Sequence, residues 1–600
     1  MSEYDCDVVV VGMGPMGATT ALALASYGIS VQMINKRNWV ADSPRAHITN
    51  QRAAEVLRDL GLESAVLRHA TPWDQIGDTL FTTSLAGTEV ARLRAWGTGD
   101  ALHGNYQSVS PCPIVDIPQS LLEPVLIGAA AERGAKLTFN TEYVSHEQDA
   151  DGVTVSLFDR VRKGSYTVRA RYLVGADGAN SRVAADVGLE ILGEKARAGT
   201  IYAQFDADLT RYVAHRPSIL HWIMNPEAGH GEIGMGLLRA VRPWDKWIAG
   251  WGFDTNEEPD LSPENAIRRI RLLVGDPNLE ATVTAVAPWY VNQAWATSYS
   301  SGRVFCGGDA VHMHPPSNGL GSNTSLQDGY NLAWKIAYVI KGYAQSSLLD
   351  SYSEERVDVG SQVVARANRS RVEYRPLVET FYGTDRTVSV DEALKRVNNP
   401  QGAEVRDALK EAVDLKNYEY NAHGIELNHR YESGAVLADP TLPPESWEKD
   451  TELFAQPAAR PGAKLPHAWL VGSDGRRLST LDVVGKGHMS LLTGLAGEAW
   501  VAAAESLGLE YLSPIRIGEP SYTDPYFEWR AVSGIAEAGA LLVRPDGVIA
   551  WRHAGPPGDQ KAATELLQAA LAELGMTGPL EPRELVAGNP QFADLARNQK

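Results

Sequence analysis

Cysteine is nearly missing from this chain: only Cys6, Cys112 and Cys306 occur among 600 residues, and they stand far apart. Because no Cys-x-x-Cys pair is present, we expect no zinc site, no dithiol centre and no disulfide framework. No apolar run reaches the roughly 20 residues that a membrane-spanning helix needs. The opening Met-Ser-Glu-Tyr-Asp lacks the basic and apolar regions of a signal peptide. These absences predict a cytoplasmic protein without a bound metal.

Positive charge is also in short supply, with 55 Lys and Arg against 74 Asp and Glu, a net charge of −19. Such a balance argues against binding to nucleic acid or to an anionic membrane surface. The hydrophobic content of 44% and charged content of 22% are ordinary for a soluble globular enzyme. Six hundred residues exceed a single hydrophobic core, so we expect two to four domains.

A glycine-rich turn stands close to the N-terminus. The apolar residues 8–11 read as a buried parallel strand, and Gly12, Gly14 and Gly17 follow at Gly-x-Gly-x-x-Gly spacing. Such glycines allow a tight turn, close approach of the backbone to a pyrophosphate, and close packing of the next helix, whose N-terminus attracts phosphate. We therefore predict dinucleotide binding here; an ordinary strand-to-helix turn is the alternative.

The second strand of this unit ends in Met33-Ile34-Asn35-Lys36-Arg37. An acidic residue usually binds the ribose hydroxyls at this point, and Asn35 stands in its place. This position therefore leaves FAD and NAD(P) both open. The following loop carries Arg45 and His47, near the strand ends where ligands bind in such sheets; a solvated loop is the alternative.

Two further strand-like runs end in glycine and aspartate. One runs into Gly175-Ala-Asp177-Gly178, and the other into Gly307-Gly308-Asp309. The second continues through a Pro- and Gly-rich loop into a helix, which suits an anion such as the N1–C2=O edge of a reduced flavin. His312 and His314 lie in this stretch, but no carboxylate or cysteine stands at ligand spacing, so we do not expect a metal.

Tryptophan is plentiful, with 15 residues, several of them within residues 199–287. This region reads as a separate sheet with an aromatic face, and it favours an aromatic-lined cavity over tryptophans that only fill a core. No second strand-associated Gly-x-Gly-x-x-Gly occurs, so a dedicated NAD(P) domain is not expected.

The three motifs in this order resemble the single-component FAD-dependent aromatic hydroxylases, which share the p-hydroxybenzoate hydroxylase fold. The stretches 44–52, 242–247 and 314–324 are similar to the phenol hydroxylase branch, in which Asn at position 35 is expected. The resemblance implies an α/β fold (α+β overall): a Rossmann-like FAD domain, an inserted β-sheet substrate domain and a thioredoxin-like C-terminal domain lacking Cys-x-x-Cys. The implied boundaries are 1–75 with 100–185 and 290–385 for FAD, 76–99 with 186–289 for substrate, a connector over 386–455, the thioredoxin-like domain over 456–576, and a tail over 577–600.

The implied activity is ortho-hydroxylation of a phenol, using NADPH or NADH, O2 and a C4a-hydroperoxyflavin. A hydroxylase of a larger polycyclic or polyketide aromatic is the alternative, and a non-catalytic flavoprotein that binds aromatics is a more distant one. Preference between the coenzymes cannot be read. The resemblance also implies a homodimer or higher homo-oligomer.

The resemblance assigns roles to individual residues. His47 is the candidate base that deprotonates the phenol, because histidine titrates near working pH. Arg242, and after it Arg239, is expected at the nicotinamide phosphates or the substrate. Predicted FAD contacts are Gly12, Gly14, Pro15, Met16, Gly17, Asn35, Lys36, Arg45, Asp116, Gln119, Asp177, Gly308, Asp309, Pro316, Gly319, Gly321, Ser322 and Asn323. Predicted substrate contacts are Trp222, Trp289, Tyr290 and Pro315.

Overall fold

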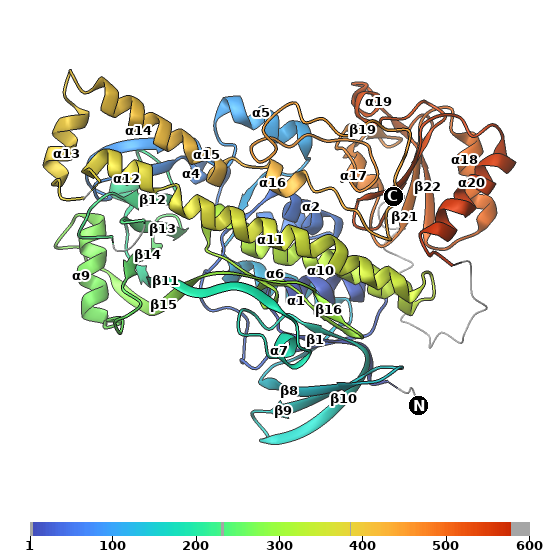
Figure 1. The fold of residues 1–600 in the computed structure, drawn as a ribbon, viewed down its shortest axis with the longest axis horizontal. Coiled ribbons are helices and arrows are strands. Elements are labelled where there is room, and N and C mark those ends of the chain that lie inside the picture. The colour runs from blue at the N-terminus through green and yellow to red at the C-terminus, as the bar shows by residue number, and fades with distance from the viewer. Residues whose placement is uncertain (1–3, 230–232, 385, 578–600) are drawn as a thin grey trace.

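The computed structural model describes residues 4–229, 233–384 and 386–577 (Figure 1). The tail predicted from residue 577 onward therefore lies outside the described residues, apart from Thr577. The described chain is a mixed α/β structure, as predicted, and it is built around two eight-stranded sheets and a C-terminal αβ unit. None of the helices within the described ranges combines the length and apolar character needed to cross a bilayer.

The first sheet begins with the predicted N-terminal strand. Its central strands are parallel, in the order β17 (Val304–Cys306), β10 (Gly164–Gly175), β1 (Cys6–Val11), β2 (Val31–Ile34) and β7 (Lys136–Thr138). β16 (Ser300–Ser301), β8 (Thr141–Gln148) and β9 (Val153–Asp159) add antiparallel edges. Val11 pairs with Gly175, and Gly175 with Cys306, so all three predicted glycine motifs leave the sheet at one edge.

Helices cover this sheet closely. They are α1 (Pro15–Ser26), α6 (Gln119–Glu132), α10 (Leu320–Ile340) and α11 (Ser351–Val372), and α1 packs between α6 and α10. α1 is rich in alanine, and every residue from Met16 to Ala25 is buried, because small side chains let neighbouring helices approach closely. α10 and α11 lie across the middle of the molecule (Figure 1). The first turn of α10 follows the third glycine motif, and Tyr352 in the first turn of α11 donates to the Cys306 carbonyl oxygen at 2.9 Å.

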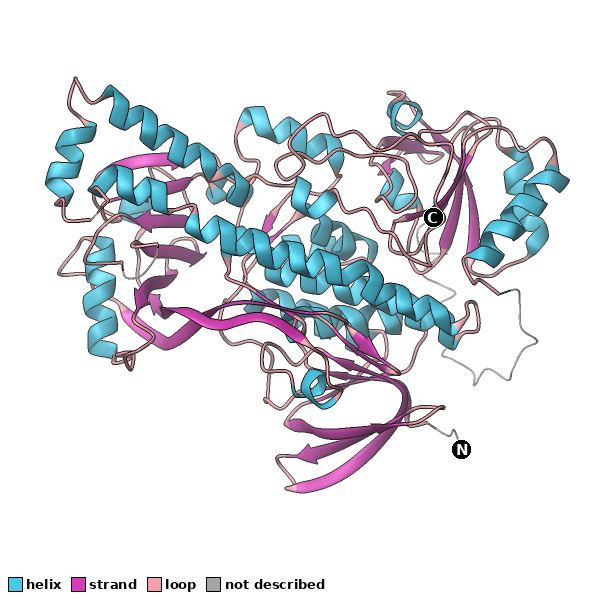
Figure 2. Ribbon diagram, in the orientation of Figure 1, coloured by secondary structure: helices cyan, strands magenta, loops and turns pink. Residues whose placement is uncertain are grey.

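The second sheet holds the tryptophan-rich region. Its order is β18 (His312–Met313), β15 (Thr282–Ala296), β11 (Ile191–Asp206), β14 (Lys246–Phe253), β13 (Gly236–Arg242), β12 (Leu220–Ile223), β4 (Thr79–Thr82) and β5 (Glu89–Leu93). The long strands β11 and β15 run between the two sheets (Figure 2). α9 (Pro263–Val274) and α12 (Arg375–Tyr382) share the hydrophobic core of this sheet.

The segment between the FAD-binding region and the C-terminal unit is helical in part. It contains α13 (Val390–Val397), α14 (Ala403–Leu415), α15 (Asn417–Tyr420) and α16 (Gly424–Leu427). α14 packs against α12, and Leu409, Val413 and Tyr420 join the core of the second sheet. A segment distant in sequence thus reaches the tryptophan-rich region.

The C-terminal unit has a four-stranded sheet in the order β22 (Leu512–Arg516), β21 (Met489–Thr493), β24 (Ala540–Val543) and β25 (Ile549–His553), with α18 (Glu498–Leu507) and α20 (Gln560–Glu573) packed together beside it. A small sheet of β20 (Arg477–Ser479), β19 (Trp469–Gly472) and β23 (Tyr522–Thr523) completes it. A hairpin around Asp546-Gly547 joins β24 to β25. The thioredoxin-like character of this unit stays a prediction.

Candidate active site

The first glycine motif forms a tight turn in which side chains are excluded. Gly12 has φ +107°, and a Cβ there would overlap the carbonyl oxygen of Ala176. A Cβ on Gly17 would overlap the carbonyl oxygen of Gly12, whereas one on Gly14 would meet only Glu123 Oε1, at 3.7 Å. Gly12 and Gly17 therefore serve the turn itself. Gly14 instead borders unfilled space, and this is where we expect the phosphates of a ligand.

The N-terminus of α1 is built for an anion. Gly14 is its N-cap and offers no side chain, and Pro15 occupies the first turn. The free N–H groups and the positive end of the helix dipole point at the edge of the sheet where the three motifs meet. Met16 and Gly17 are buried in the first turn. This turn and its uncapped helix fit the pyrophosphate of FAD.

Buried polar groups hold the neighbouring loop in place. Glu123 accepts from Gln119 Nε2 at 2.5 Å and from the Ala41 N–H at 2.6 Å, and burial raises the pKa of its carboxyl. Arg45, from the same loop, bonds Ser43 Oγ at 3.2 Å. The structure thus brings Arg45 and Gln119 toward the pyrophosphate turn, and it adds Glu123, which no sequence motif marks.

The end of β2 opens onto a basic hollow. Asn35 donates from Nδ2 to the Trp39 carbonyl oxygen at 3.1 Å and accepts from the Arg37 N–H, which shapes the loop that follows. Beside it lies a hollow of about 430 Å³. It is lined by Lys36, Arg37, Asn38, Trp39, Val40, Asp42, Asn140, Arg160 and Lys163.

Asp177 acts locally. Its carboxylate accepts from Ser181 Oγ at 2.5 Å and from the Arg182 N–H at 2.7 Å, at the start of α7 (Arg182–Asp186). The preceding Ala176 lies against Gly12, so the Asp177 turn borders the pyrophosphate turn. The structure therefore places Asp177 at the predicted edge with its carboxylate engaged in capping.

The third motif is fixed from behind by a buried carboxylate. Gly308 has φ +63°, and its N–H donates to Asp328 Oδ2 at 3.0 Å. Asp328 also pairs with His312 Nε2 at 2.9 Å and accepts from Arg356 Nε at 2.7 Å. Asp309, next along the turn, has an exposed side chain. One buried aspartate on α10 thus sets the backbone of this turn.

α10 begins as a second uncapped helix. Its N-cap, Gly319, has φ +63° and is the last residue of a short turn over residues 317–319. This turn comes directly after Pro315 and Pro316. Asn323 donates from Nδ2 to the Ile48 carbonyl oxygen at 2.8 Å and accepts from the Asn50 N–H at 2.9 Å. Gly321 and Ser322 lie in this first turn. Asn323 therefore ties the predicted flavin loop to the strand that follows His47.

His47 is buried and its two ring nitrogens have no hydrogen-bond partner among the described residues. It precedes β3 (Ile48–Thr49), which pairs with β6 (Val115–Asp116), and this pairing brings His47 Nδ1 to 4.0 Å from Asp116 Oδ1. Burial, and after it the charge of Arg239, holds the pKa of His47 well below its ordinary value of 6.5. The imidazole is therefore neutral at pH 7 and available to a ligand.

Asp116 anchors this corner. Its carboxylate accepts from Thr71 Oγ1 at 2.5 Å and forms an ion pair with Arg239, and all three side chains are buried. Burial raises the pKa of the Asp116 carboxyl, and Arg239 opposes that rise. Arg239 Nη1 has no partner among the described residues. We call His47, Asp116 and Arg239 the ring-site cluster.

Aromatic side chains border the cluster. The Arg239 guanidinium lies 5.6 Å from the ring centre of Trp96, which meets Tyr420 edge to face at 5.5 Å. Trp222 donates from Nε1 to Tyr420 Oη at 2.7 Å and packs on Tyr374 at 4.5 Å. The predicted Trp222 is thus joined to the ring-site cluster through Trp96 and Tyr420.

Other predicted residues are placed elsewhere. Arg242 ends β13, donates to the His69 carbonyl oxygen at 3.0 Å, and helps from a distance to lower the pKa of Asp116. Trp289 and Tyr290 lie on β15; Tyr290 is 40% exposed and packs on Phe253. No ring contact within the described chain joins these two aromatics to Trp222. Arg239 is thus buried beside Asp116, whereas Arg242 is half-buried at the end of the strand, and the role expected for each at the coenzyme or the substrate stays a prediction.

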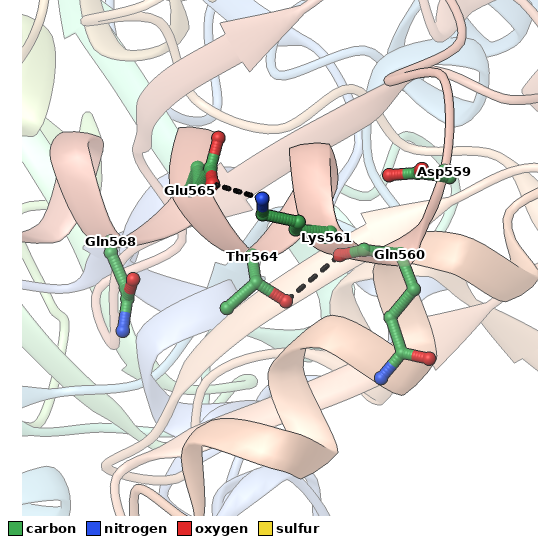
Figure 3. Close-up of a pocket in the computed structure, with 6 residues that line it drawn as sticks. All are labelled: Asp559, Gln560, Lys561, Thr564, Glu565 and Gln568. Atoms are coloured by element: carbon green, nitrogen blue, oxygen red, sulfur yellow. Dashed lines mark hydrogen bonds and ion pairs between the residues drawn. The ribbon is translucent and has the colours of Figure 1, made fainter.

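A separate surface hollow lies on α20 of the C-terminal unit (Figure 3). Its side chains bond within the helix: Lys561 pairs with Glu565, and Thr564 Oγ1 donates to the Gln560 carbonyl oxygen. All come from one exposed helical stretch, so this hollow has none of the buried chemistry found at the glycine edge. Across the described ranges, no three His, Cys, Asp or Glu side chains gather as a metal would require.

Known proteins share both parts of this chain. Residues 5–367 match the family described as FAD binding domain, and residues 458–575 match aromatic-ring hydroxylase, C-terminal. The chain is 46% identical over 582 residues to 2,4-dichlorophenol 6-monooxygenase of Cupriavidus pinatubonensis (strain JMP 134 / LMG 1197), covering 95% of this chain and 96% of that protein. It is 43% identical over 572 residues to phenol 2-monooxygenase of Pseudomonas sp. (strain EST1001), covering 93% and 91%.

A solved structure agrees with these sequence relatives. The flavin-dependent monooxygenase PieE, in complex with FAD and substrate, superposes with a TM-score of 0.89 at 40% identity, covering 95% of this chain and 99% of that one. The pyrophosphate turn, the uncapped helices and the family match agree on the cofactor and on the class of reaction. This chain belongs to the FAD-dependent aromatic-ring hydroxylases, and it is an enzyme.

Proposed function

We propose that this hydroxylase acts on a phenol, adding oxygen at the ortho position with NADPH or NADH and O2 as co-substrates. The observation that carries the proposal is His47: a buried, neutral imidazole whose two nitrogens have no hydrogen-bond partner among the described residues, 4.0 Å from a buried Asp116–Arg239 pair. Buried polar groups without partners are rare, because each costs about 1–3 kcal/mol. A phenolic hydroxyl would give His47 the partner it lacks.

The cofactor is held by backbone more than by side chains. FAD, once reduced by the nicotinamide coenzyme, supplies the activation of O2. The turn at Gly12 and Gly14 with the N-terminus of α1 would hold its pyrophosphate, and the turn at Gly308 its ribityl chain. The N-terminus of α10 offers free N–H groups to the anionic edge of the reduced ring system.

His47 is proposed to take the phenol's proton. A phenolate ring is a stronger nucleophile than a phenol, so removal of this proton favours attack on electrophilic oxygen. The lowered pKa of His47 keeps it in the basic form at pH 7. When the imidazole takes the proton, the carboxylate of Asp116 stabilises the new positive charge, and Arg239 restrains how far the proton affinity rises. Asp116, proposed at first as a flavin contact, thus acts on the base.

The apolar wall beside the cluster suits an aromatic ring. The Trp96 ring lies 5.6 Å from the Arg239 guanidinium and contacts Tyr420, and Tyr420 accepts the Trp222 indole N–H. Pro315 remains a proposed contact from the loop that enters α10. A larger polycyclic aromatic is the second candidate substrate, because the same groups would face one phenolic ring of it.

We propose NADPH as the preferred coenzyme. The hollow beside Asn35 is lined by four cations, Lys36, Arg37, Arg160 and Lys163, on a chain whose net charge is −19. An anionic group enters such a hollow favourably, and NADPH carries a phosphate that NADH lacks. An Arg160→Ala, Lys163→Ala double variant, which keeps the predicted FAD contact Lys36, is expected to lose selectivity for NADPH over NADH, measured as the ratio of kcat/KM values. A hollow without this role would leave that ratio unchanged.

The predicted domain boundaries, the thioredoxin-like C-terminal unit and a homodimer are kept as proposals from the resemblance. Light scattering on the purified holoenzyme measures the mass directly: twice 65.0 kDa supports the dimer. A mass equal to one chain would contradict the proposed dimer.

The deciding experiment measures oxidation of NADPH and NADH by the purified holoenzyme, with and without phenol or 2,4-dichlorophenol, together with the mass of the product. Stimulated oxidation and a product heavier by one oxygen atom support the proposal. Stimulated oxidation that yields only peroxide points to the larger polycyclic substrate, which an anthraquinone then tests. The proposal fails if no phenol stimulates oxidation. A His47→Gln variant, which keeps the flavin contacts, is the matched control.

A further inference from the structure

The hairpin between β24 and β25 inserts a charged side chain into the FAD-binding part of the molecule. Arg544 is buried, with 1% of its surface exposed. Its Nη1 and Nη2 donate to the two carboxylate oxygens of Glu355 on α11, at 2.5 and 2.9 Å. Its Nε donates to Asp546 Oδ1 at 3.0 Å. A residue of the C-terminal unit therefore makes a bidentate ion pair with a buried carboxylate on a helix of the FAD-binding part.

This pair belongs to a connected set of buried polar groups. Lys335 donates to Glu355 Oε2 at 2.8 Å and to Asn331 Oδ1 at 2.9 Å, and Asn331 Nδ2 donates to both Glu355 and Asp546. We call Asn331, Lys335, Glu355, Arg544 and Asp546 the clamp cluster. Each member is at most 3% exposed, and every nitrogen and oxygen of these side chains has a partner.

The clamp cluster adjoins the groups that set the third glycine turn. Arg356, which follows Glu355 on α11, donates to Asp328, and Asp328 receives the Gly308 N–H. On α10, Asp328, Asn331 and Lys335 are spaced by three and four residues, so they share one face of the helix. The two helices thus carry the C-terminal contact and the flavin-turn contact on adjacent residues.

The hairpin also contacts the helix that follows His47 and β3. Arg52, on α2 (Gln51–Asp59), donates from Nη2 to the Asp546 carbonyl oxygen at 2.6 Å. Tyr330 Oη on α10 donates to the Pro545 carbonyl oxygen at 3.0 Å. α2 follows Asn50, which is bonded to Asn323 at the N-terminus of α10. One hairpin therefore contacts both helices that leave the flavin edge and the ring-site cluster.

Stability alone does not account for a cluster of this kind. Removing charges from water costs several kcal/mol for each ion, and well-packed apolar groups often serve a core as well or better. A fully satisfied buried network does fix one arrangement of the elements that carry it. In this chain those elements are α10 and α11, and what they position is the turn at Gly308 and the N-terminus of α10.

We propose that Arg544 and Asp546 are positioning residues of the flavin site. Through Glu355 and Asn331 they set the placement of α10 and α11, so that the Gly308 turn and the first turn of α10 keep the geometry that holds the flavin. The C-terminal unit contains no cysteine, so this role needs no redox chemistry of its own. The inference deepens the proposed function and rests on it for the use of the flavin.

The test compares holoenzymes of Arg544→Met, Arg544→Lys and wild type. Two readouts are followed: the dissociation constant of FAD from flavin fluorescence, and the share of NADPH oxidation that ends as product instead of peroxide. Long-range coupling energies typically change affinity by about 5–150-fold, and we expect Arg544→Met to weaken FAD binding within that range. Arg544→Lys, which keeps one ion pair, is expected to recover part of the loss and to supply a folded variant if Arg544→Met does not fold.

Matched variants separate positioning from general loosening. Leu541→Ala weakens the core of the C-terminal unit without touching the clamp cluster, and Arg516→Gln removes an exposed pair with Glu498. Equal losses of FAD affinity in Arg544→Lys and Leu541→Ala, at matched stability, would overturn the inference. So would additive effects of Arg544→Met and Asp328→Asn, because distant unconnected sites are additive. FAD affinity is measured without turnover, so this result can be interpreted even if the phenol proposal fails.

Discussion

The ring-site cluster and the clamp cluster are built from similar groups, and their hydrogen bonding differs. Both pair a buried arginine with a buried carboxylate, Arg239 with Asp116 and Arg544 with Glu355. In the clamp cluster every polar side-chain atom has a partner. In the ring-site cluster both nitrogens of His47 and Nη1 of Arg239 have none among the described residues.

This difference separates structure from chemistry. Leaving a buried donor or acceptor unpaired costs about 1–3 kcal/mol, so a fold keeps such groups where a ligand completes them. The satisfied cluster lies between the C-terminal hairpin and two helices, where it fixes an arrangement. The unsatisfied cluster lies beside Trp96 and next to the strand tied to α10, where an aromatic hydroxyl and a flavin are proposed to meet.

The largest expected effect comes from breaking the satisfied cluster. Glu355→Leu removes the carboxylate that serves both Arg544 and Lys335 and leaves two buried cations without it. Removing one partner of a buried ion pair costs about 3–5 kcal/mol, and we expect a loss of that size in the free energy of unfolding. Urea unfolding of the holoenzyme measures it.

Glu498→Leu is the matched control for that change. Glu498 forms an exposed ion pair with Arg516, and such pairs contribute about 0–1 kcal/mol. Similar losses in the two variants would mean that burial and completeness of the clamp cluster do not matter, and the contrast between the clusters would lose its energetic basis.

The next effect is on activity alone. His47→Gln removes a side chain that makes no hydrogen bond in the described chain, so we expect the free energy of unfolding to change by less than about 1 kcal/mol. Loss of a general base costs about 10²–10⁴-fold, and kcat/KM for the phenol should fall by that factor. Steady-state kinetics with product analysis measures the fall. A variant that loses stability and keeps its rate would make His47 structural.

Local sequence patterns predicted the glycine-rich edge of the first sheet well. The three glycine motifs are short and contiguous, and each depends on backbone needs that only a few residue types meet, as Gly12 shows with φ +107°. The parallel pairing of Val11, Gly175 and Cys306 then brings them to one edge, as the strand-to-turn pattern requires. The position of the loop that carries His47 was predicted on the same ground, because this loop comes after a strand of the same sheet.

The ring side was harder to predict, because its contacts join distant parts of the chain. Asp116 and Arg239 are 123 residues apart, and Trp222 and Tyr420 are 198 apart. Nothing near Trp96 or Tyr420 in sequence marks them as partners. Arg239 and Arg242 stand on one strand, and only packing decides that Arg239 turns to Asp116. Arg544 lies in the turn between β24 and β25, and its burial against Glu355 depends on how two units dock.

A smaller effect is expected at the edge of the ring-site cluster. Trp222→Phe removes the indole N–H that Tyr420 Oη accepts and keeps most of the apolar surface. A hydrogen bond of this kind contributes about 1 kcal/mol, so KM for the phenol should rise by about fivefold with a smaller change in kcat. Trp289→Phe, on β15, is the control and should leave KM unchanged. If Trp289→Phe has the larger effect, the substrate lies against β15, where Trp289 and Tyr290 were predicted alongside Trp222 as substrate contacts.

The smallest expected effect is on the pH dependence of kcat/KM, which we expect to be nearly flat between pH 6 and pH 8. A histidine of ordinary pKa would lose its basic form on acidification, and a rate that needs this form would fall about fourfold from pH 8 to pH 6. Burial and Arg239 hold the pKa of His47 well below 6.5, so its basic form persists over this range. We therefore expect kcat/KM for phenol, whose hydroxyl ionises near pH 10 like that of tyrosine, to change by less than about 1.5-fold.

The same lowered pKa has a consequence for stability that His47→Gln can expose. In the unfolded chain His47 binds a proton below its ordinary pKa of 6.5, whereas the folded chain resists that proton. The contribution of His47 is therefore complete above pH 6.5 and is lost as the pH falls toward the folded pKa. We expect wild type to lose more stability between pH 7 and pH 5 than His47→Gln does, by urea unfolding. If wild type and His47→Gln lose the same stability while kcat/KM falls with a midpoint near pH 6.5, the folded chain does not hold His47 in its neutral form. The distinction between the ring-site cluster and the clamp cluster would then lose its support from His47.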